Sequence, residues 1–340
     1  MRKLENKIPS YLEKLIARPH AFAEKKPPLD LGQIQEMHDL FIAQYQRVPN
    51  FINLNSVSEN FKDVLIVGDT HGELNSTQRI IKPFLDGKVN SLIFLGDYVD
   101  RGIDSFVNLF LLVGMAIAWP DRVILLRGNH EDSYVNAQFD FFSSLQNIFP
   151  NPKDTEKAAS MIDDIYNYLS LIAISPQGSV CVHGGLPRGI IAAQILTEIP
   201  KPHRAIADIK GDQKRQKIQD AFMELRWNDP TEDKVKDPEA KSYHGFYFFT
   251  KGQLSQFLKK NEYKRLIRSH ESQRGSFERM FDGMLLHVLS MESQSSSNVS
   301  MGYYFGNLKK GLTVHEEPDG TTLLRDLDFN VISRIDHAQF

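Results

Sequence analysis

The chain has 340 residues, of which 40 are Lys or Arg, 43 are Asp or Glu, one is Cys and 41% are hydrophobic. This length and apolar fraction allow one large domain or two ordinary ones and exclude wholesale disorder. The net charge of -3 argues against a dedicated nucleic-acid-binding protein, and a single cysteine excludes a disulfide-stapled secreted scaffold and favours the reducing cytoplasm.

The first 59 residues are predicted to form helices that pack on the remainder of the chain. The opening stretch, MRKLENKIPSYLEKL, is charged throughout and carries no signal-peptide core. Apolar side chains recur at helical spacing in two stretches, which predicts one buried face in each: Leu12, Leu15 and Ile16, and then Ile34, Met37, Phe41 and Tyr45.

Five short apolar runs follow, and each ends in a polar cluster. A short apolar run bounded by glycine and polar residues indicates a buried strand. Helical patterns at 77–85 and 105–119 separate the first three runs, and this alternation predicts a mostly parallel sheet with crossover helices. The runs are 64–67 before GDTHG, 92–95 before GDYVDRG, 123–126 before RGNHE, 179–182 before HGG, and 266–268 before Ser269 and His270.

The longest apolar run, residues 106–119, is too short for the roughly 20 residues that a membrane span needs. Asn108 and Gly114 interrupt it, and Pro120 closes it. We therefore predict a buried helix here and no membrane span.

The C-terminal third is less regular. Residues 253–260 suggest a helix, whereas 231–241 and 294–300 are expected to form polar loops. The stretch 312–340 alternates apolar and polar residues around Pro318, Asp319 and Gly320, which predicts a hairpin or edge strands.

Polar residues far apart in the sequence are expected to meet at one edge of the predicted sheet. Parallel strands place their carboxyl ends along one edge, and ligands of open α/β sheets bind just outside those ends. The residues brought together in this way are Asp69, His71, Asp97, Asp100, Arg101, Asn129, His130, His183 and His270. The remaining histidines are interpreted as surface or packing residues (His20, His38, His203, His315, His337) or as a core residue (His287).

The chemistry of this set points to metal ions. Carboxylate, imidazole and amide groups without a thiolate suit Mn, Fe or Zn in an open site. Two Asp, one Asn and three His exceed what one ion normally takes, so two ions that share a carboxylate are the economical arrangement. Two metals about 3.5–4 Å apart act on both sides of an in-line displacement at phosphorus and lower the pKa of a bridging water.

The motifs GDTHG (68–72), GDYVDRG (96–102), GNHE (128–131), HGG (183–185) and RSH (268–270) resemble those of the metallophosphoesterases. More narrowly, their order and spacing over about residues 60–305 resemble the phosphoprotein phosphatase family of serine/threonine phosphatases. Residues 168–187 and 225–230 also resemble that family. The resemblance implies an α/β fold, a four-layer α/β/β/α sandwich with mixed central sheets. The catalytic domain would span 60–305, with N-terminal helices (1–59) and C-terminal strands (306–340) packed on it.

The resemblance also implies roles for individual residues. Asp69 and His71 would bind one metal, Asp97 would bridge both, and Asn129, His183 and His270 would bind the other. Arg101 would grip the substrate phosphate with help from Asn129, and His130 would be the general acid, held and kept charged by Asp100. The family uses direct attack by a metal-bridging hydroxide without a phosphoenzyme, and Cys181, which lies inside an apolar strand, is interpreted as an inert thiol.

Two departures from the family pattern concern the substrate surface. Alignment of residues 242–249 places His244 where the family has a second phosphate-binding arginine, and imidazole is a weaker, pH-dependent phosphate ligand. Arg226 and Arg274 are candidate replacements. Residues 289–297 (LSMESQSSS) replace the family's Ser-Ala-Pro-Asn-Tyr segment, so the tyrosine that overlooks the metals has no clear counterpart. We therefore expect an altered substrate preference and weak sensitivity to the family's natural toxins.

The leading hypothesis is a metal-dependent phosphatase acting on phosphoproteins, with phosphoserine and phosphothreonine favoured and phosphotyrosine open. Manganese is the expected metal, with iron or zinc as alternatives, and a regulatory or targeting partner is left open. The departures suggest a divergent member, bacterial or an injected effector, which in the latter case would act in the host-cell cytosol. The alternatives are a hydrolase of dinucleoside polyphosphates or other small phosphate esters and, in another class, a non-catalytic adaptor. Asp100 and Arg101 could also form a structural ion pair.

Overall fold

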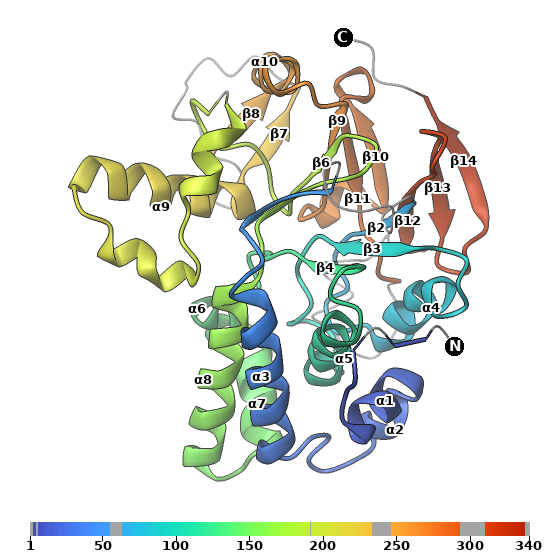
Figure 1. Cartoon of the computed structure of the whole chain (residues 1–340), viewed down its shortest axis with the longest axis vertical. Coiled ribbons are helices and arrows are strands. Elements are labelled where there is room, and N and C mark those ends of the chain that lie inside the picture. The colour runs from blue at the N-terminus through green and yellow to red at the C-terminus, as the bar shows by residue number, and fades with distance from the viewer. Residues whose placement is uncertain are drawn as a thin grey trace.

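Two mixed β-sheets lie face to face at the centre of the molecule, and helices cover both outer faces (Figure 1). The computed structural model describes residues 3–4, 6–54, 63–190, 192–232, 246–292 and 310–336. Within these residues each of the two sheets has six strands. The α/β/β/α sandwich predicted from the sequence is therefore confirmed.

The first sheet contains the predicted strand–helix alternation. Its order is β14-β13-β12-β2-β3-β4, and β2, β3 and β4 run parallel, with Val67 opposite Phe94 and Phe94 opposite Leu125. Helices α4 (Leu74–Leu85) and α5 (Ser105–Ala118) make the two crossovers. The observed strands agree with the predicted runs to within one residue: β2 (Val64–Val67), β3 (Ser91–Phe94) and β4 (Val123–Leu125).

The C-terminal strands extend this same sheet. β12 (Leu312–Glu316) pairs antiparallel with β2, and β13 (Thr322–Asp326) and β14 (Val331–Ile335) follow as antiparallel neighbours. The predicted hairpin is confirmed, and Gly320, at its turn, has a φ of 84° that favours glycine.

The second sheet, in the order β1-β5-β6-β9-β11-β10, combines parallel and antiparallel pairs. β1 (Phe51–Asn53) pairs parallel with β5 (Ile172–Ile174), so the N-terminal region contributes a strand as well as helices. The division into residues 1–59, 60–305 and 306–340 stays a prediction. The other strands are β6 (Ser179–Cys181), β9 (Arg265–Arg268), β10 (Phe277–Met280) and β11 (Leu285–Val288).

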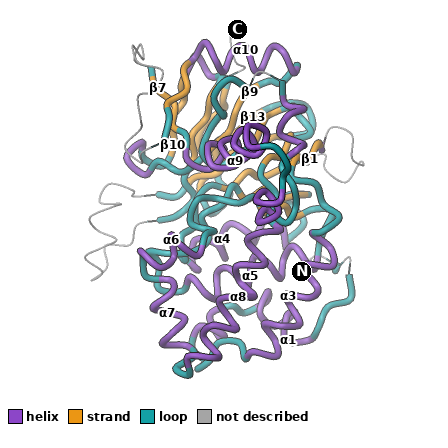
Figure 2. Tube along the Cα trace, turned by 90° about the vertical axis from the view of Figure 1, so that its left-hand side faces the viewer, coloured by secondary structure: helices purple, strands orange, loops and turns teal. Residues whose placement is uncertain are grey.

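Three apolar clusters of buried side chains lie between the helices and sheets, whose arrangement Figure 2 shows from the side. Successive side chains of a strand point to opposite faces, so each strand serves two layers. In β2, Val67 belongs to the apolar cluster of one outer helical layer, whereas Ile66 packs between the sheets. In β6, Val180 packs against the outer helices and Cys181 packs between the sheets, where burial raises the pKa of its thiol.

The helices of one outer layer bury the faces that the sequence predicts. Every apolar residue predicted on the inner faces of α1 (Ser10–Ala17) and α3 (Leu31–Tyr45) is buried. Helix α5 is buried along its whole length, and no helix among the described residues has the length and apolarity needed to cross a bilayer. The same layer holds α2 (His20–Ala23), α6 (Ser133–Gln138), α7 (Phe141–Ile148) and α8 (Pro152–Tyr168).

Leu12 anchors α1 on α5, and we expect its loss to destabilise the fold. Its side chain is fully buried and sits over Gly114, where an added Cβ would come within 2.4 Å of Leu12 Cδ1. Leu12→Ala is expected to lower the free energy of unfolding by about 2–5 kcal/mol, because it leaves a cavity between the helices. Urea unfolding of this variant beside the exposed Glu13→Ala measures the difference, and equal stability of the two would contradict the packing described.

The opposite outer layer contains α9 (Asp212–Trp227) and α10 (Lys251–Asn261), beside the short pair β7 (Asp229–Thr231) and β8 (Phe248–Thr250). The helix predicted over 253–260 is α10, which begins two residues earlier at a capping box formed by Thr250 and Gln253. Most of the predicted loop 231–241 and all of the loop 294–300 lie outside the described residues.

Candidate active site

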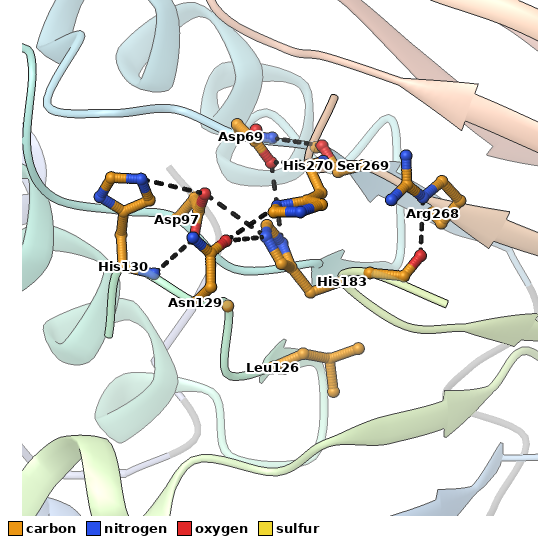
Figure 3. A network of polar contacts seen from close by, with 12 residues as sticks. Asp69, Asp97, Leu126, Asn129, His130, His183, Arg268, Ser269 and His270 are labelled. Atoms are coloured by element: carbon orange, nitrogen blue, oxygen red, sulfur yellow. Dashed lines mark hydrogen bonds and ion pairs between the residues drawn. The ribbon is translucent and has the colours of Figure 1, made fainter. Parts of the chain in front are cut away.

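The predicted site residues converge on the loops that follow β2, β3, β4, β6 and β9. These five loops meet at one edge of the sandwich, and the close-up in Figure 3 shows side chains from both sheets pointing toward one another. All nine predicted residues lie in this group, and all but the half-buried Arg101 are buried.

The backbone of these loops is unusual. Five of the site residues have positive φ angles, and residues other than glycine rarely adopt this backbone conformation. Such strain persists where the surrounding structure over-determines it, and it clusters at functional sites. The residues are His71 (40°), Asp97 (57°), Asp100 (65°), Arg101 (72°) and His270 (82°).

His71, Asp97 and His130 form one group whose ligand atoms lie close enough together to hold a cation. His71 Nδ1 donates to the carbonyl of Val99 at 2.8 Å, which turns Nε2 toward the carboxylates. That Nε2 lies 3.5 Å from Asp97 Oδ2 and 3.8 Å from Asp69 Oδ2. Asp69 and His71 therefore lie together beside Asp97, as the sequence predicts.

Asp97, His183 and His270 form a second such group, which shares Asp97 with the first. His183 Nε2 lies 3.4 Å from Asp97 Oδ2 and 2.8 Å from Asn129 Oδ1. His270 Nδ1 lies 2.9 Å from the same amide oxygen. The central position of Asp97 between the groups is the placement that a bridging carboxylate requires.

His130 and Asp100 make the shortest contact of the predicted catalytic residues. His130 Nδ1 donates to Asp100 Oδ2 at 2.7 Å, and Asp100 also accepts from Asn136 Nδ2 at 2.8 Å and from the backbone N–H of Phe141 at 3.1 Å. The Asp100 carboxylate is thus directed at the imidazole.

Arg101 lies at the mouth of the site. Its Nη1 donates to His71 Nε2 at 3.1 Å and its Nη2 donates to His130 Nε2 at 3.2 Å. The guanidinium therefore faces both imidazoles, in a position from which it can reach an anion that lies between them.

Burial dominates the electrostatics of the site. It raises the pKa of Asp69 to about 6, with a further contribution from Asp97, and it raises the pKa of Asp97 itself. Burial also lowers the pKa of His183 to about 4 and that of His71 well below its usual range. The site therefore combines carboxylates that resist carrying an uncompensated charge with neutral imidazoles.

This combination fits divalent cations. A cation offsets the charge of buried carboxylates, and neutral imidazole nitrogen with carboxylate oxygen is a donor set that Mn, Fe and Zn accept. His183 Nδ1 is buried and makes no hydrogen bond within the described part of the chain. His183 Nδ1 lies 3.8 Å from Asp69 Oδ1, which is too far for a hydrogen bond between the imidazole and the carboxylate.

Two residues that sequence reasoning did not single out hold the loops in place. Glu131 Oε2 accepts from the backbone N–H groups of Asp97 and Gly128, both at 2.8 Å, so it ties two site loops together. Arg268 Nε donates to the carbonyl of Gly184 at 2.6 Å, and its Nη2 donates to Asp229 at 2.9 Å. Glu131 ends the GNHE motif and Arg268 begins the RSH motif, so membership of these motifs is the only sequence feature that points to them.

Gly128 is one of the glycines that allow the loops to approach closely. A Cβ at this position would lie 2.3 Å from Asp97 Oδ1, so any side chain would displace the shared carboxylate. This contact explains why glycine follows Arg127 in the third motif.

Both candidate replacements for the second phosphate-binding arginine have protein partners among the described residues. Arg274 pairs with Glu271 and Glu278 at 2.5 and 2.9 Å. Arg226 is 1% exposed, and its Nη1 lies 3.4 Å from the Gly128 carbonyl and 3.5 Å from Asp132. His244 and most of the altered loop 289–297 lie outside the described residues.

Three of the other unassigned histidines lie in the interior: His203, His287 and His315. His287 is fully buried and lies 3.4 Å from Arg268, in agreement with its interpretation as a core residue. His315 is buried between Asp63 and Arg325, at 3.3 and 2.9 Å.

Comparison with known families gives a match over most of the chain. The profile of the calcineurin-like phosphoesterases matches residues 62–274. The catalytic subunit of serine/threonine-protein phosphatase 4 from Candida glabrata is 32% identical over 241 residues, which is 70% of this chain and 72% of that protein. A protein phosphatase 2A catalytic subunit from Dictyostelium discoideum is 30% identical over the same shares.

Solved structures show the same fold. A protein serine/threonine phosphatase from Saccharomyces cerevisiae superimposes with a TM-score of 0.73 at 20% identity, over 97% of this chain and 98% of the other. A cold-active protein-tyrosine phosphatase from a Shewanella species gives a TM-score of 0.53 at 16% identity, over 87% and 84%.

Proposed function

The chain belongs to the calcineurin-like phosphoesterases and, within them, to the serine/threonine protein phosphatases, and we propose that it hydrolyses phosphoserine and phosphothreonine in proteins. The observation that carries this proposal is that all six predicted ligands, and the contact between His130 and Asp100, lie at one edge of the sandwich. An adaptor would not need to keep both the ligand set and the acid.

We assign two divalent cations, manganese by preference, to positions on either side of Asp97, with Asp69 in place of His130 among the ligands of the first because His130 is the proposed acid. Asp69, His71 and Asp97 would hold one cation, and Asp97, Asn129, His183 and His270 would hold the other. Bound divalent cations supply Lewis-acid stabilisation of phosphoryl oxygens and make water acidic enough to ionise near neutral pH.

Arg101 is proposed to bind the substrate phosphate. Its fork of N–H donors matches two phosphate oxygens, and it is half-buried, so solvent screens its charge less than that of a surface arginine. Its present contacts with His71 and His130 place it over the position between them. Asn129, whose amide oxygen faces His183 and His270, offers its amide N–H as a second donor.

His130 is proposed to give a proton to the leaving serine or threonine oxygen. Its Nδ1–H is held by Asp100, so Nε2 is the nitrogen that would carry the transferable proton in the imidazolium, once Arg101, which donates to Nε2 here, has turned to the substrate phosphate. That Nε2 lies 4.0 Å from Asp97 Oδ2 and faces the site. Asp100 fixes the ring orientation and stabilises the imidazolium before transfer.

A substrate panel tests the proposed function. The metal-stripped protein is reconstituted with manganese, zinc or iron and assayed on phosphoserine, phosphothreonine and phosphotyrosine peptides and on a dinucleoside polyphosphate. We expect turnover of the serine and threonine peptides, greatest with manganese. Turnover of the dinucleotide alone would assign a small-molecule hydrolase, and no turnover with any metal would refute the enzyme.

Location and partners follow the same proposal. The reducing cytoplasm, or the host-cell cytosol for an injected effector, is where we expect the enzyme to act, with a regulatory or targeting partner. Because the family's Ser-Ala-Pro-Asn-Tyr segment is replaced here, we also propose weak inhibition by the family's natural toxins. Tight binding in an inhibition titration would contradict that last point.

Asp100→Asn is expected to lower kcat by about 10–100-fold, the usual effect of losing a carboxylate that orients a histidine. The amide keeps the size of the side chain but cannot stabilise the imidazolium. The Michaelis constant for a phosphopeptide is expected to change little, because Arg101 is retained. Steady-state kinetics beside Asp140→Asn, whose carboxylate accepts from the Arg101 backbone N–H, measures the difference. Equal kcat values for the wild type and Asp100→Asn would refute the role of Asp100.

A further inference from the structure

A polar cluster lies behind the loop that contains Asn129 and His130. Its central residue is His203, which is 3% exposed and begins the short 3-10 helix His203–Asp208. Sequence patterns assign this histidine no partner, because its contacts come from residues 76 and 153 positions away.

Hydrogen bonds on both ring nitrogens fix the tautomer of His203. Arg127 Nη1 lies 2.8 Å from His203 Nδ1, and Asn50 Oδ1 lies 2.9 Å from His203 Nε2. A guanidinium only donates, so Nδ1 accepts and Nε2–H donates to the amide oxygen. A doubly protonated ring would point an N–H at the guanidinium, and burial together with Arg127, Lys201 and Arg226 lowers the pKa of His203 well below its usual range.

Arg127 connects this histidine to the catalytic loop. It follows Leu126, which lies below the site in Figure 3, and its Nε donates to the carbonyl of Glu131 at 2.9 Å. This contact closes the loop 128–131 on itself. The backbone N–H of Arg127 also donates to the Ser170 carbonyl at 2.7 Å, so one end of the loop is fixed to the segment just before β5.

The far side of His203 is anchored as firmly. Asn50 Nδ2 donates to the carbonyls of Ile199 and Pro200 at 2.9 and 3.0 Å. The ring of Phe222 lies 4.9 Å from the His203 ring and 5.3 Å from the Arg127 guanidinium, so one apolar surface covers both. The imidazole is therefore held on three sides, and Arg127 is the group that it can position.

We infer that His203 is a positioning residue for the reaction: as a neutral acceptor it holds Arg127, and through Arg127 it holds the loop that presents Asn129 and His130. The inference rests on the proposed function for its catalytic consequence. Its structural content, the acceptor nitrogen facing Arg127, is independent of that function.

Three variants separate the two hydrogen bonds of His203. In His203→Asn the amide oxygen can occupy the place of Nδ1 and accept from Arg127, whereas in His203→Gln the amide nitrogen can occupy the place of Nε2 and donate to Asn50. His203→Leu removes both bonds. We expect kcat on an aryl phosphate to stay within about threefold of wild type for the Asn variant. It is expected to fall by about 10–100-fold for the Gln and Leu variants.

Two measurements do not depend on turnover. Calorimetric titration with Mn²⁺ is expected to give about tenfold weaker binding for the Gln and Leu variants and near-wild-type binding for the Asn variant, because Asn129 lies on the positioned loop. Nitrogen-15 NMR of the histidine rings in the metal-free protein, with His203→Asn to assign the signal, is expected to show a neutral ring protonated on Nε2.

The outcomes are decisive in both directions. Asn and Gln variants that match one another in kcat and in Mn²⁺ affinity would overturn the inference, as would a ring protonated on Nδ1. A wild-type protein without phosphatase activity would refute the proposed function, while the metal titration and the NMR spectrum would still decide the role of His203. Thermal unfolding of each variant shows whether the Asn and Gln forms are equally folded.

Discussion

Asp97→Asn is expected to reduce phosphatase activity by about a thousandfold or more, the largest effect expected of any single substitution in this site. Asp97 is the one carboxylate common to both groups of ligand atoms, so its neutral replacement weakens both at once. The asparagine Oδ1 can still accept the backbone N–H of His130, which Asp97 Oδ1 now accepts at 2.9 Å. The loop geometry should therefore survive.

The stability of Asp97→Asn separates a chemical effect from misfolding. Burial raises the pKa of Asp97, so its ionised form lowers the stability of the metal-free protein at neutral pH. The variant is expected to unfold at the same temperature as the metal-free wild type or at a higher one. The exposed Asp39→Asn, on α3, serves as the matched control. Full activity of Asp97→Asn with manganese would refute the shared-carboxylate site, whereas retained phosphoprotein binding without turnover would agree with it.

His130→Asn is expected to lower kcat by about 10²–10⁴-fold on a phosphoserine peptide, the usual range for loss of a general acid. The loss should be much smaller on an aryl phosphate, because a phenolate of low pKa leaves without receiving a proton. The ratio of the two losses is the informative quantity, since a structural defect would lower both rates equally.

Kinetics on both substrates, with His38→Asn as the control, give this ratio. His38 is a residue of α3, where its ring nitrogens lie 2.8 Å from Asp39 on the same helix and 3.3 Å from Asp164 on α8. Equal losses on peptide and aryl phosphate would show that His130 orients the site rather than acting as its acid.

The strands that could be predicted from the sequence are those with clear boundaries. The runs ending at Val67 and near Leu95 are short, wholly apolar and closed by glycine, and the strands end there to within one residue. The rule that parallel strands share a carboxyl edge then placed the site residues together without any knowledge of the loops. Family resemblance added roles, and the structure supplies the contacts that make those roles geometrically feasible.

Long-range polar contacts could not be predicted in this way. The acceptor for Arg127 is His203, and no periodicity relates two positions joined only by the fold. The strand β1 was missed because Phe51–Asn53 is only three residues long and pairs with a strand 121 positions later, Phe51 lying opposite Ile172. Glu131 was quoted within its motif, but its role depends on backbone N–H groups that carry no sequence signal.

The placement of the second ligand group has a consequence for the protein as a whole. Asp97 follows a strand of the first sheet, whereas His183 and His270 follow strands of the second. A cation held by all three would connect the two sheets. Because it would bind only the folded protein, occupancy of this site by the cation and global unfolding are thermodynamically linked. Removal of the metal by a chelator should then weaken the contact between the two sheets first, and the melting temperature of this phosphatase should fall as its metal content falls.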